Sequence, residues 1–325
     1  MIIKNPIYGT FEIHEKQLID LILSGAMQRL KFISQQGLTR RMLPESHPFF
    51  SRYDHSVGVM LLLRKLGASL EEQTAGLLHD ASHTTFSHVV DGFLGDPSKE
   101  SYQDDVHSSY IAGPWLSGLL SEYNIDPARI SDFRNFSLLD KELPDLCADR
   151  LDYTLESAIM LYYPEAQKLA DSLIVKDSEI IFNSKETASS FGRMYMEFQQ
   201  ELWASDVIAI KYFFFAKLLK LAIEKKVLKE EDLYTDDEYV MRKLEGSSDE
   251  DLSSYLAFLY SEPKFKHNEI SPQYIIRKKF RYVDPKYLEN GKVLRLSEND
   301  YEYKSIIDAE RKRLEDGIKV DIEMQ

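Results

Sequence analysis

His79 and Asp80 stand side by side in the segment AGLLHDASHTTFSH (75–88). Imidazole and carboxylate groups are preferred ligands of divalent first-row metals. More histidines crowd the same region, because six of the chain's eight fall within residues 47–107, namely His47, His55, His79, His83, His88 and His107. The cluster predicts a metal centre of the kind that hydrolases use.

Four residues from three predicted helices are the candidate metal ligands: His55, His79, Asp80 and Asp149. Neighbouring residues on a helix point about 100° apart, so His79 and Asp80 converge on one ion only if it lies between helices. Two imidazoles and two carboxylates suit Fe, Mn, Zn or Ni, and spacing does not distinguish these metals. A His-Asp pair alone is common on helix surfaces. Here the apolar AGLL run before Asp80 favours a ligand, since buried Asp is rare unless paired or coordinated.

Three arginines are candidates for binding phosphate groups, because a guanidinium forms bidentate contacts with phosphate. Arg52 lies about one turn before the first candidate ligand, so both can face one cavity. Arg150 directly follows the last candidate ligand. Arg193 lies further along the chain, and a surface position explains it equally well.

Two further residues are placed for proton transfer and substrate contact. His83 follows the first histidine of the His-Asp pair by one turn and is the candidate acid–base residue. Tyr153 follows Asp149 by four residues, so a metal ligand and an aromatic ring share one helix face. Tyr153 as ordinary core packing is the competing interpretation.

Helical patterns dominate the elements that must position these residues. A helix over 15–35 stops at Gly37, and Ser69 with Glu72 opens a helix that runs through the His-Asp pair. Further helices are predicted at 143–161, at 184–203 after an N-cap at Asn183, and at 205–227, with Asp126-Pro127 opening a short one. The predicted fold is mainly α-helical, a bundle.

The C-terminal part has a different pattern. The acidic, Ser-rich stretch at 245–254 is the predicted boundary between a body at 1–245 and a small α+β appendage at 255–325. Within that appendage, 278–297 alternates apolar and polar residues around Glu289-Asn290-Gly291, which predicts a β-hairpin, and a last helix is predicted at 300–316.

Composition restricts the possible partners and compartments. No apolar run approaches the roughly 20 residues that span a bilayer, and the N-terminus has no signal-peptide pattern. The single cysteine, Cys147, suits a reducing cytoplasm. The net charge of −14 argues against binding duplex nucleic acid. A local group of Arg and Lys still suffices for a small phosphorylated ligand.

The chain resembles the HD-domain phosphohydrolases, and within them the SAMHD1-like deoxynucleoside triphosphate triphosphohydrolases. Six segments carry the resemblance in the family's order: NPIYGTFEI (5–13), QRLKFISQQG (28–37), SRYDHSVGVM (51–60), AGLLHDASHTTFSHVVD (75–91), DVHSSYI (105–111) and ADRLDYT (148–154). It extends from residue 3 to about 165. The resemblance therefore implies an HD-domain helical bundle.

The resemblance also implies roles for individual residues. It assigns the metal to the same four ligands, and it makes Asp91 and His107 the residues that orient His83. It makes His88 a phosphate or substrate contact, and Gln35 a contact to the sugar. It gives Tyr153 a place in the wall of the nucleotide pocket, and Arg193 matches a phosphate-contacting arginine loosely.

The predicted reaction is hydrolysis of a (deoxy)nucleoside triphosphate at the α-phosphate, which releases nucleoside and triphosphate, with Mg bound to the nucleotide phosphates. Ser157 stands where the triphosphohydrolases usually carry an Asp, and Ser82, Thr84 and Thr85 replace two glycines and a proline of the motif. Two alternatives stay open: an HD phosphatase or phosphodiesterase for a ribonucleotide or alarmone, and a non-catalytic nucleotide sensor. The family also predicts a homo-oligomer, for which the aromatic run Tyr212–Phe215 is a candidate interface or, equally, core.

Overall fold

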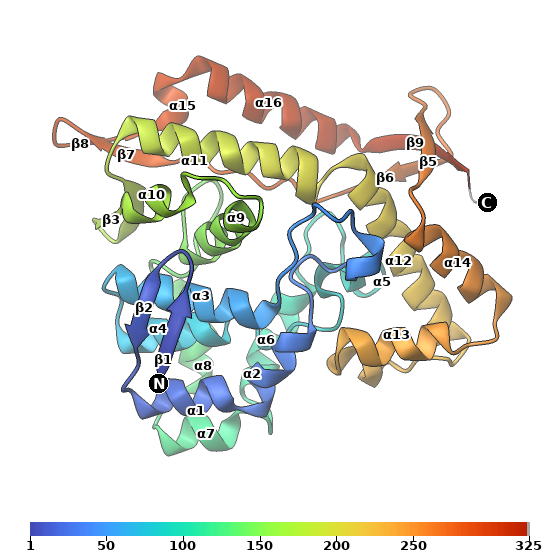
Figure 1. The fold of residues 1–325 in the computed structure, drawn as a ribbon, viewed down its shortest axis with the longest axis horizontal. Helices are drawn as coiled ribbons and strands as arrows, with labels where there is room; N and C mark the ends of the chain where they lie inside the picture. Colours follow the sequence, from blue (N-terminus) through green and yellow to red (C-terminus); the bar gives the residue numbers. More distant parts are fainter. Residues whose placement is uncertain (324–325) are drawn as a thin grey trace.

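The computed structural model describes residues 1–323 and is mainly helical (Figure 1). The longer helices are α1 (Lys16–Leu23), α3 (Arg52–Lys65), α4 (Leu70–Leu78), α6 (Tyr102–Ile111), α9 (Ala148–Met160), α11 (Lys185–Phe198), α12 (Asp206–Glu224), α13 (Asp237–Glu245), α14 (Glu250–Tyr260) and α16 (Tyr301–Asp316). Shorter helices are α2 (Gly25–Arg29), α5 (Asp91–Leu94), α7 (Ser117–Glu122), α8 (Pro127–Ile130), α10 (Ala166–Asp171) and α15 (Leu296–Asn299). The predicted fold class is confirmed.

Helices α3, α4 and α9 form the bundle that positions the candidate site. A reciprocal capping box between Ser51 and Asp54 starts α3. Most of α3 is buried, because α4 packs on one side of it and α9 on another. At the α3–α9 crossing, a Cβ at Gly58 would clash with the buried carboxylate of Asp152, so only glycine permits this approach.

Several predicted helix boundaries are wrong. The segment 15–35 is broken, because Ser24 leaves the helical conformation after α1 and caps α2 through its side chain. The helix expected from 143 begins at Ala148, after Pro144. Ser184, rather than Asn183, accepts the capping hydrogen bond of α11. The predicted caps at Ser69 and Asp126 are confirmed.

The strands form three antiparallel hairpins or sheets, with one parallel pairing. Strands β1 (Ile2–Asn5) and β2 (Gly9–Glu12) form a hairpin, and β5 (Lys264–His267), β9 (Ile318–Glu323) and β6 (Tyr274–Ile276) form a three-stranded sheet. A four-stranded sheet contains β3 (Leu173–Lys176), β4 (Glu179–Phe182), β7 (Lys286–Glu289) and β8 (Lys292–Arg295). The predicted hairpin is confirmed as β7–β8, since Asn290 and Gly291 have φ values of 50° and 78°, as its tight turn requires.

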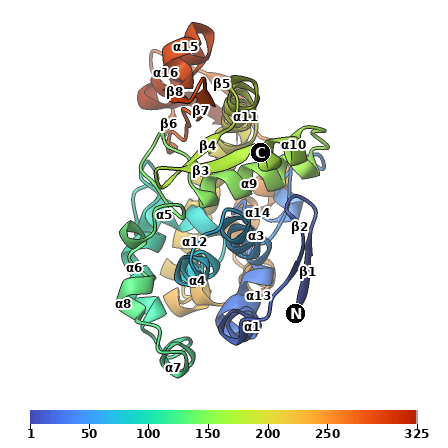
Figure 2. The same cartoon turned by 90° about the vertical axis from the view of Figure 1, so that its left-hand side faces the viewer.

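The C-terminal segment packs against the body. Strand β7 pairs in parallel with β4, and α16 lies along α11 at one end of the molecule, opposite α1 and α7 (Figure 2). Leu314 and Val320 share a hydrophobic core with Leu38 and Phe86. The division of the chain near residues 245–255 stays a prediction. In the structure, the parts before and after this boundary share the four-stranded sheet and a hydrophobic core. No helix within residues 1–323 is both long and apolar enough to cross a membrane.

Candidate metal centre

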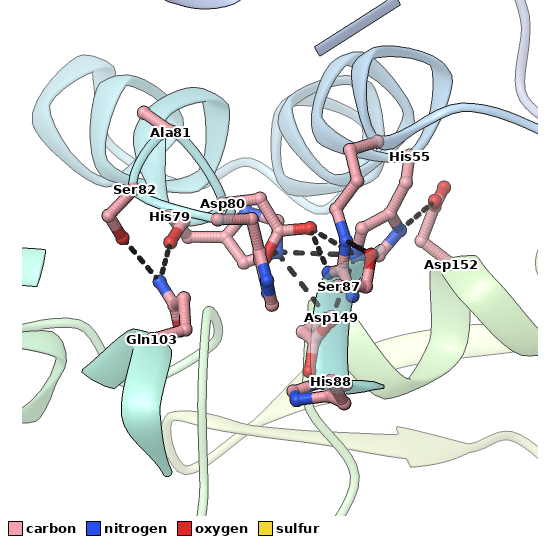
Figure 3. Close-up of polar contacts among 12 residues, drawn as sticks. His55, His79, Asp80, Ala81, Ser82, Ser87, His88, Gln103, Asp149 and Asp152 are labelled. Carbon is pink, nitrogen blue, oxygen red and sulfur yellow. Dashed lines mark hydrogen bonds and ion pairs between the residues drawn. The ribbon is translucent and has the colours of Figure 1, made fainter. Parts of the chain in front are cut away.

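The candidate ligands meet where helix ends converge. His55 lies in the first turn of α3, and Asp149 lies in the first turn of α9. Helix α4 ends at Leu78, so His79 is its C-cap and Asp80 lies in the turn that follows. The prediction that this pair lies within a helix is therefore wrong. Figure 3 shows the side chains of His55, His79, Asp80 and Asp149 directed toward one another.

The ligand atoms lie within reach of one ion. The Nε2 atoms of His55 and His79 are 3.2 Å apart, and Asp149 Oδ1 lies 3.0 Å and 3.6 Å from them. Asp80 Oδ1 lies 3.4 Å from His79 Nε2. His55, His79 and Asp80 offer buried ligand atoms that all lie within 4.8 Å of one another. These three residues can bind a divalent metal, and Asp149 lies beside them.

Both imidazole rings are oriented by a second hydrogen bond. His55 Nδ1 lies 2.8 Å from Asp152 Oδ2, and Tyr8 donates its hydroxyl hydrogen to the other oxygen of that carboxylate at 2.9 Å. His79 Nδ1 lies 2.7 Å from the carbonyl oxygen of Gly76. Carbonyl and carboxylate oxygens accept hydrogen bonds, so both Nδ1 atoms carry a hydrogen and each ring turns its Nε2 atom toward the cluster.

This donor arrangement fits a divalent cation. Two facing Nε2 lone pairs at 3.2 Å repel each other unless a positive charge lies between them. That separation suits two ligands each about 2 Å from one metal ion. Imidazole with carboxylate is also the ligand chemistry of first-row transition metals. Asp152 and Tyr8, which the sequence reasoning missed, supply the outer hydrogen bonds typical of such sites.

The site is strongly polarised. Burial alone lowers the pKa of His55, but hydrogen bonds to Asp149 and Asp152 outweigh burial and raise it to about 10. Burial raises the pKa of Asp80, yet the charge of Arg52 and the neighbouring histidines hold it well below its usual range. Arg52 donates to Asp80 Oδ2 at 2.6 Å, and both side chains are at most 6% exposed. The carboxylates therefore favour a bound cation at the Nε2 atoms.

The other predicted catalytic residues lie near the cluster but pair differently than expected. His83 Nε2 lies 3.3 Å from Asp80 Oδ1, and its ring is 5.0 Å from the ring of His88. Asp91 pairs with His88 at 3.3 Å. His107 Nδ1 lies 2.9 Å from the hydroxyl oxygen of Ser82. His83 therefore contacts Asp80, and not Asp91 or His107 as was expected. The turn after α4 brings His83 toward the candidate metal ligands.

A cavity of about 280 Å³ opens beside the metal cluster. The residues predicted for substrate binding that line it are Gln35, Arg52, His88, Arg150 and Tyr153. Trp203 and Tyr212 add an aromatic wall. Arg193 lies elsewhere: it pairs with Asp300 at 2.8 Å and with Glu302 in a surface groove between α11 and α16. Its predicted role in this cavity is wrong, because α11 turns it toward the C-terminal helix.

Sequence reasoning missed one wall of the cavity. Lys278, Lys279 and Arg281 line it, together with the carboxylate of Glu100. These cations belong to the segment KKFR (278–281), which lies between β6 and β7. This segment has three positive charges in four residues, although the chain as a whole has a net charge of −14. That contrast in the sequence could have indicated an anion-binding segment.

Comparisons of sequence and fold relate this chain to known proteins. Residues 52–111 match the family model of the HD domain. YdhJ of Bacillus subtilis is 32% identical over 326 residues, 99% of either chain. The metal-dependent phosphohydrolase cns2 of Cordyceps militaris is 34% identical over 214 residues, which are 63% of this chain and 61% of that protein. A phosphohydrolase structure from Bacteroides thetaiotaomicron has the same fold, with a TM-score of 0.68 at 16% identity over the full length of both chains.

The chain belongs to the HD-domain metal-dependent phosphohydrolases, as the sequence motifs predicted. The narrower resemblance, to the SAMHD1-like triphosphohydrolases, has less support. The deoxynucleoside triphosphate triphosphohydrolase SAMHD1 of Bos taurus is 36% identical over 107 residues, which are 28% of this chain and 18% of that protein. The likeness covers little more than a quarter of this chain, so the substrate of this chain is a separate question.

Proposed function

We propose that this phosphohydrolase acts on nucleotides, with water attacking the α-phosphate of a (deoxy)nucleoside triphosphate to release nucleoside and triphosphate. One observation carries the proposal: the cavity beside the metal ligands combines a cationic part with an aromatic part. Its cations are Arg52, Arg150, Lys278, Lys279 and Arg281, and its aromatic side chains include Tyr153, Trp203 and Tyr212. Cations suit phosphate groups, and aromatic rings suit a nucleobase.

The proposed roles follow from position. His55, His79, Asp80 and Asp149 would hold a divalent metal such as Fe, Mn, Zn or Ni. When bound, that metal polarises a phosphoryl oxygen and lowers the pKa of a water molecule. Mg would accompany the nucleotide phosphates.

Side chains around the ligands would bind the phosphate and move the proton. Arg52 is held by Asp80 and by the hydroxyl of Ser87 at 2.8 Å, so its remaining donors are oriented for a phosphate oxygen. His83 would give a proton to the leaving oxygen. His88, oriented by Asp91, would contact a phosphate.

Three predicted residues receive less direct roles. Gln35 lines the cavity, and its Oε1 atom is buried without a partner among residues 1–323, so we assign it to a hydroxyl of the sugar. Arg150 would contact phosphate. His107 would position the turn after α4 through its contact with Ser82.

A second candidate is a phosphatase or phosphodiesterase for another nucleotide, such as a ribonucleotide or alarmone. Ser157 supports this second candidate. Its side chain is fully buried and donates to the carbonyl oxygen of Tyr153 at 2.8 Å. This residue therefore does not supply the sugar contact that the Asp of the triphosphohydrolases would make. Product identity distinguishes the two reactions.

The test is product identification with defined metals. Purified protein with Mn(II) or Fe(II) and Mg(II) is incubated with dNTPs, NTPs and ppGpp, alongside Asp80→Ala and the control Asp308→Ala, an exposed Asp on α16. We expect nucleoside and inorganic triphosphate from wild type and the control, and none from Asp80→Ala. Monophosphate or diphosphate products would select the second candidate. Tight nucleotide binding without turnover under either metal would leave a nucleotide sensor.

A further inference from the structure

The wall of the metal cavity built by residues 278–281 has a structure of its own. We propose that Lys279 and Arg281 form a second anion-binding subsite, which takes a phosphate group of the substrate other than the one at the metal. The inference rests on the proposed function, because it assigns the polyphosphate part of a nucleotide to this wall. The predicted ligand class is thus a substrate with at least two anionic groups.

A buried carboxylate fixes the cations of this wall. Glu100, whose side chain is 2% exposed, accepts from Lys278 Nζ at 2.8 Å and from the guanidinium of Arg281. The Lys278 ammonium also lies 3.8 Å from the centre of the Tyr212 ring. Two cations share one carboxylate, so the cluster has a net charge of +1 in a buried position.

Arg281 has donors left for a ligand. A guanidinium has five N–H donors, and the contact with Glu100 uses its Nη2 atom. The side chain lines the cavity and is 19% exposed, so the guanidinium is fixed at one end and open toward the cavity. Pre-orientation of this kind lowers the entropic cost of binding a phosphate.

Lys279 is a cation that no structural pairing explains. Among residues 1–323 it forms no ion pair within 4.0 Å, whereas Lys278 and Arg281, which line the same cavity, are both paired with Glu100. Burial and the charge of Arg281 lower its pKa, while the charges of Glu100 and Asp104 act in the opposite direction. Asp104 also lines the cavity, and its charge and that of Lys279 attract each other, but no ion pair within 4.0 Å joins the two side chains. A half-buried lysine of this kind suits an anionic ligand.

The wall lies within electrostatic reach of the metal side. The charges of Arg52 and Arg281 both act on the ring of His88, so both groups of cations lie near this ring. His88 packs against His83, and His83 contacts the ligand Asp80. One ligand can therefore place one phosphate near Arg52 and another near Arg281. On this proposal, a single orthophosphate occupies the position at the metal, and only a longer polyphosphate also engages Lys279 and Arg281.

Binding of inorganic phosphates tests the subsite without requiring turnover. Orthophosphate and tripolyphosphate are titrated by calorimetry into metal-free and Mn-loaded protein. The variants are Lys279→Gln and the matched control Arg277→Gln, which removes an exposed cation two residues away. We expect Lys279→Gln to weaken tripolyphosphate binding about tenfold, the effect of one charge-assisted hydrogen bond. Orthophosphate binding should change less than about twofold.

Equal tripolyphosphate affinity in Lys279→Gln and wild type would overturn the proposal. An equal loss of orthophosphate affinity would also overturn it, because the cavity would then contain one anion site rather than two. Unchanged melting temperatures confirm that both variants fold. If the variant loses tripolyphosphate affinity while wild type hydrolyses no nucleotide, the subsite stands and the proposed function fails.

Discussion

The metal side of the cavity and its cationic wall are built in different ways. On the metal side, ligands project from the ends of α3, α4 and α9, and each imidazole has a second hydrogen bond that fixes its ring. The wall at 278–281 belongs to neither a helix nor a strand, and its anchor Glu100 comes from another irregular segment. One side is held by helix packing, the other by buried ion pairs.

This difference matches the tasks we assign to the two sides. Reacting groups need positions fixed to a fraction of an ångström, which packed helices provide. Substrate recognition commonly lies on loops, whose residues change without disturbing the core. We therefore expect substitutions on the metal side to change kcat or metal affinity, and those on the wall to change KM or stability.

The largest expected effect concerns His83. His83→Gln should lower kcat about 10²- to 10⁴-fold, because it removes the proposed proton donor. Metal content, measured by elemental analysis, should match wild type. The control His14→Gln replaces an exposed histidine far from the cavity and should change neither quantity. Loss of metal in His83→Gln would show that the ring supports the ligands rather than the proton transfer.

Loss of the one carboxylate in the buried group of Glu100, Lys278 and Arg281 should lower the stability of the protein. Glu100→Gln leaves Lys278 and Arg281 without a counter-ion, and breaking a buried pair typically costs about 3–5 kcal/mol. Denaturant unfolding measures this loss, and Glu224→Gln, at an exposed glutamate, is the control. Unchanged stability would mean that water compensates the two cations, contrary to the buried structure.

Asp152 tests the outer contacts of the metal side. Asp152→Asn weakens the hydrogen bond that orients His55, so metal affinity should fall about 10- to 100-fold. Competition with a metal-binding dye measures this affinity, and one metal per chain should still bind at saturation. Tyr8→Phe, which removes the more distant contact, should have a smaller effect. An effect of Tyr8→Phe equal to that of Asp152→Asn would contradict this order.

The smallest effect at any one step of pH is a pH dependence of stability from Asp237. Its carboxylate accepts from the backbone N–H groups of Ser34 at 2.9 Å and Phe86 at 2.8 Å, beside the metal side. Burial raises its pKa to about 7. The folded protein therefore holds a proton that the unfolded chain releases near its usual pKa, about 3.9.

The free energy of unfolding should thus fall as pH rises from about 4 to 7, by at most about 1.4 kcal/mol per pH unit from this group. Asp237→Asn should remove that slope, and it should lower stability at acidic pH, because the amide accepts only one of the two hydrogen bonds. Urea unfolding at several pH values provides the measurement. A variant with the wild-type slope would place the pKa of Asp237 below this range.

Much of the local structure was predictable from short segments. The hairpin turn at Asn290-Gly291, the cap at Ser69 and the helix ending with Asp316 each follow from residues adjacent in sequence. The family also followed, as did three residues that the structure brings together and that can bind a metal, because their motifs lie within short segments of the chain.

The errors have a common cause. Helix α4 ends at Leu78 and not beyond the His-Asp pair, because the next residues turn toward candidate ligands on other helices. The spacing of Arg193 along its helix does not predict which element its side chain contacts. In the structure it contacts the N-terminal end of α16. Periodicity gives a face of a helix, not the partner of that face.

The sequence by itself determined the type of chemistry, since imidazole and carboxylate groups at this spacing suit a divalent metal wherever helices converge. The tertiary structure decided what surrounds the metal. Glu100 and Lys278 are 178 residues apart, and their ion pair exists only because the C-terminal segment packs over the cavity. A contact between distant residues depends on how all the intervening elements pack, so no short segment encodes it.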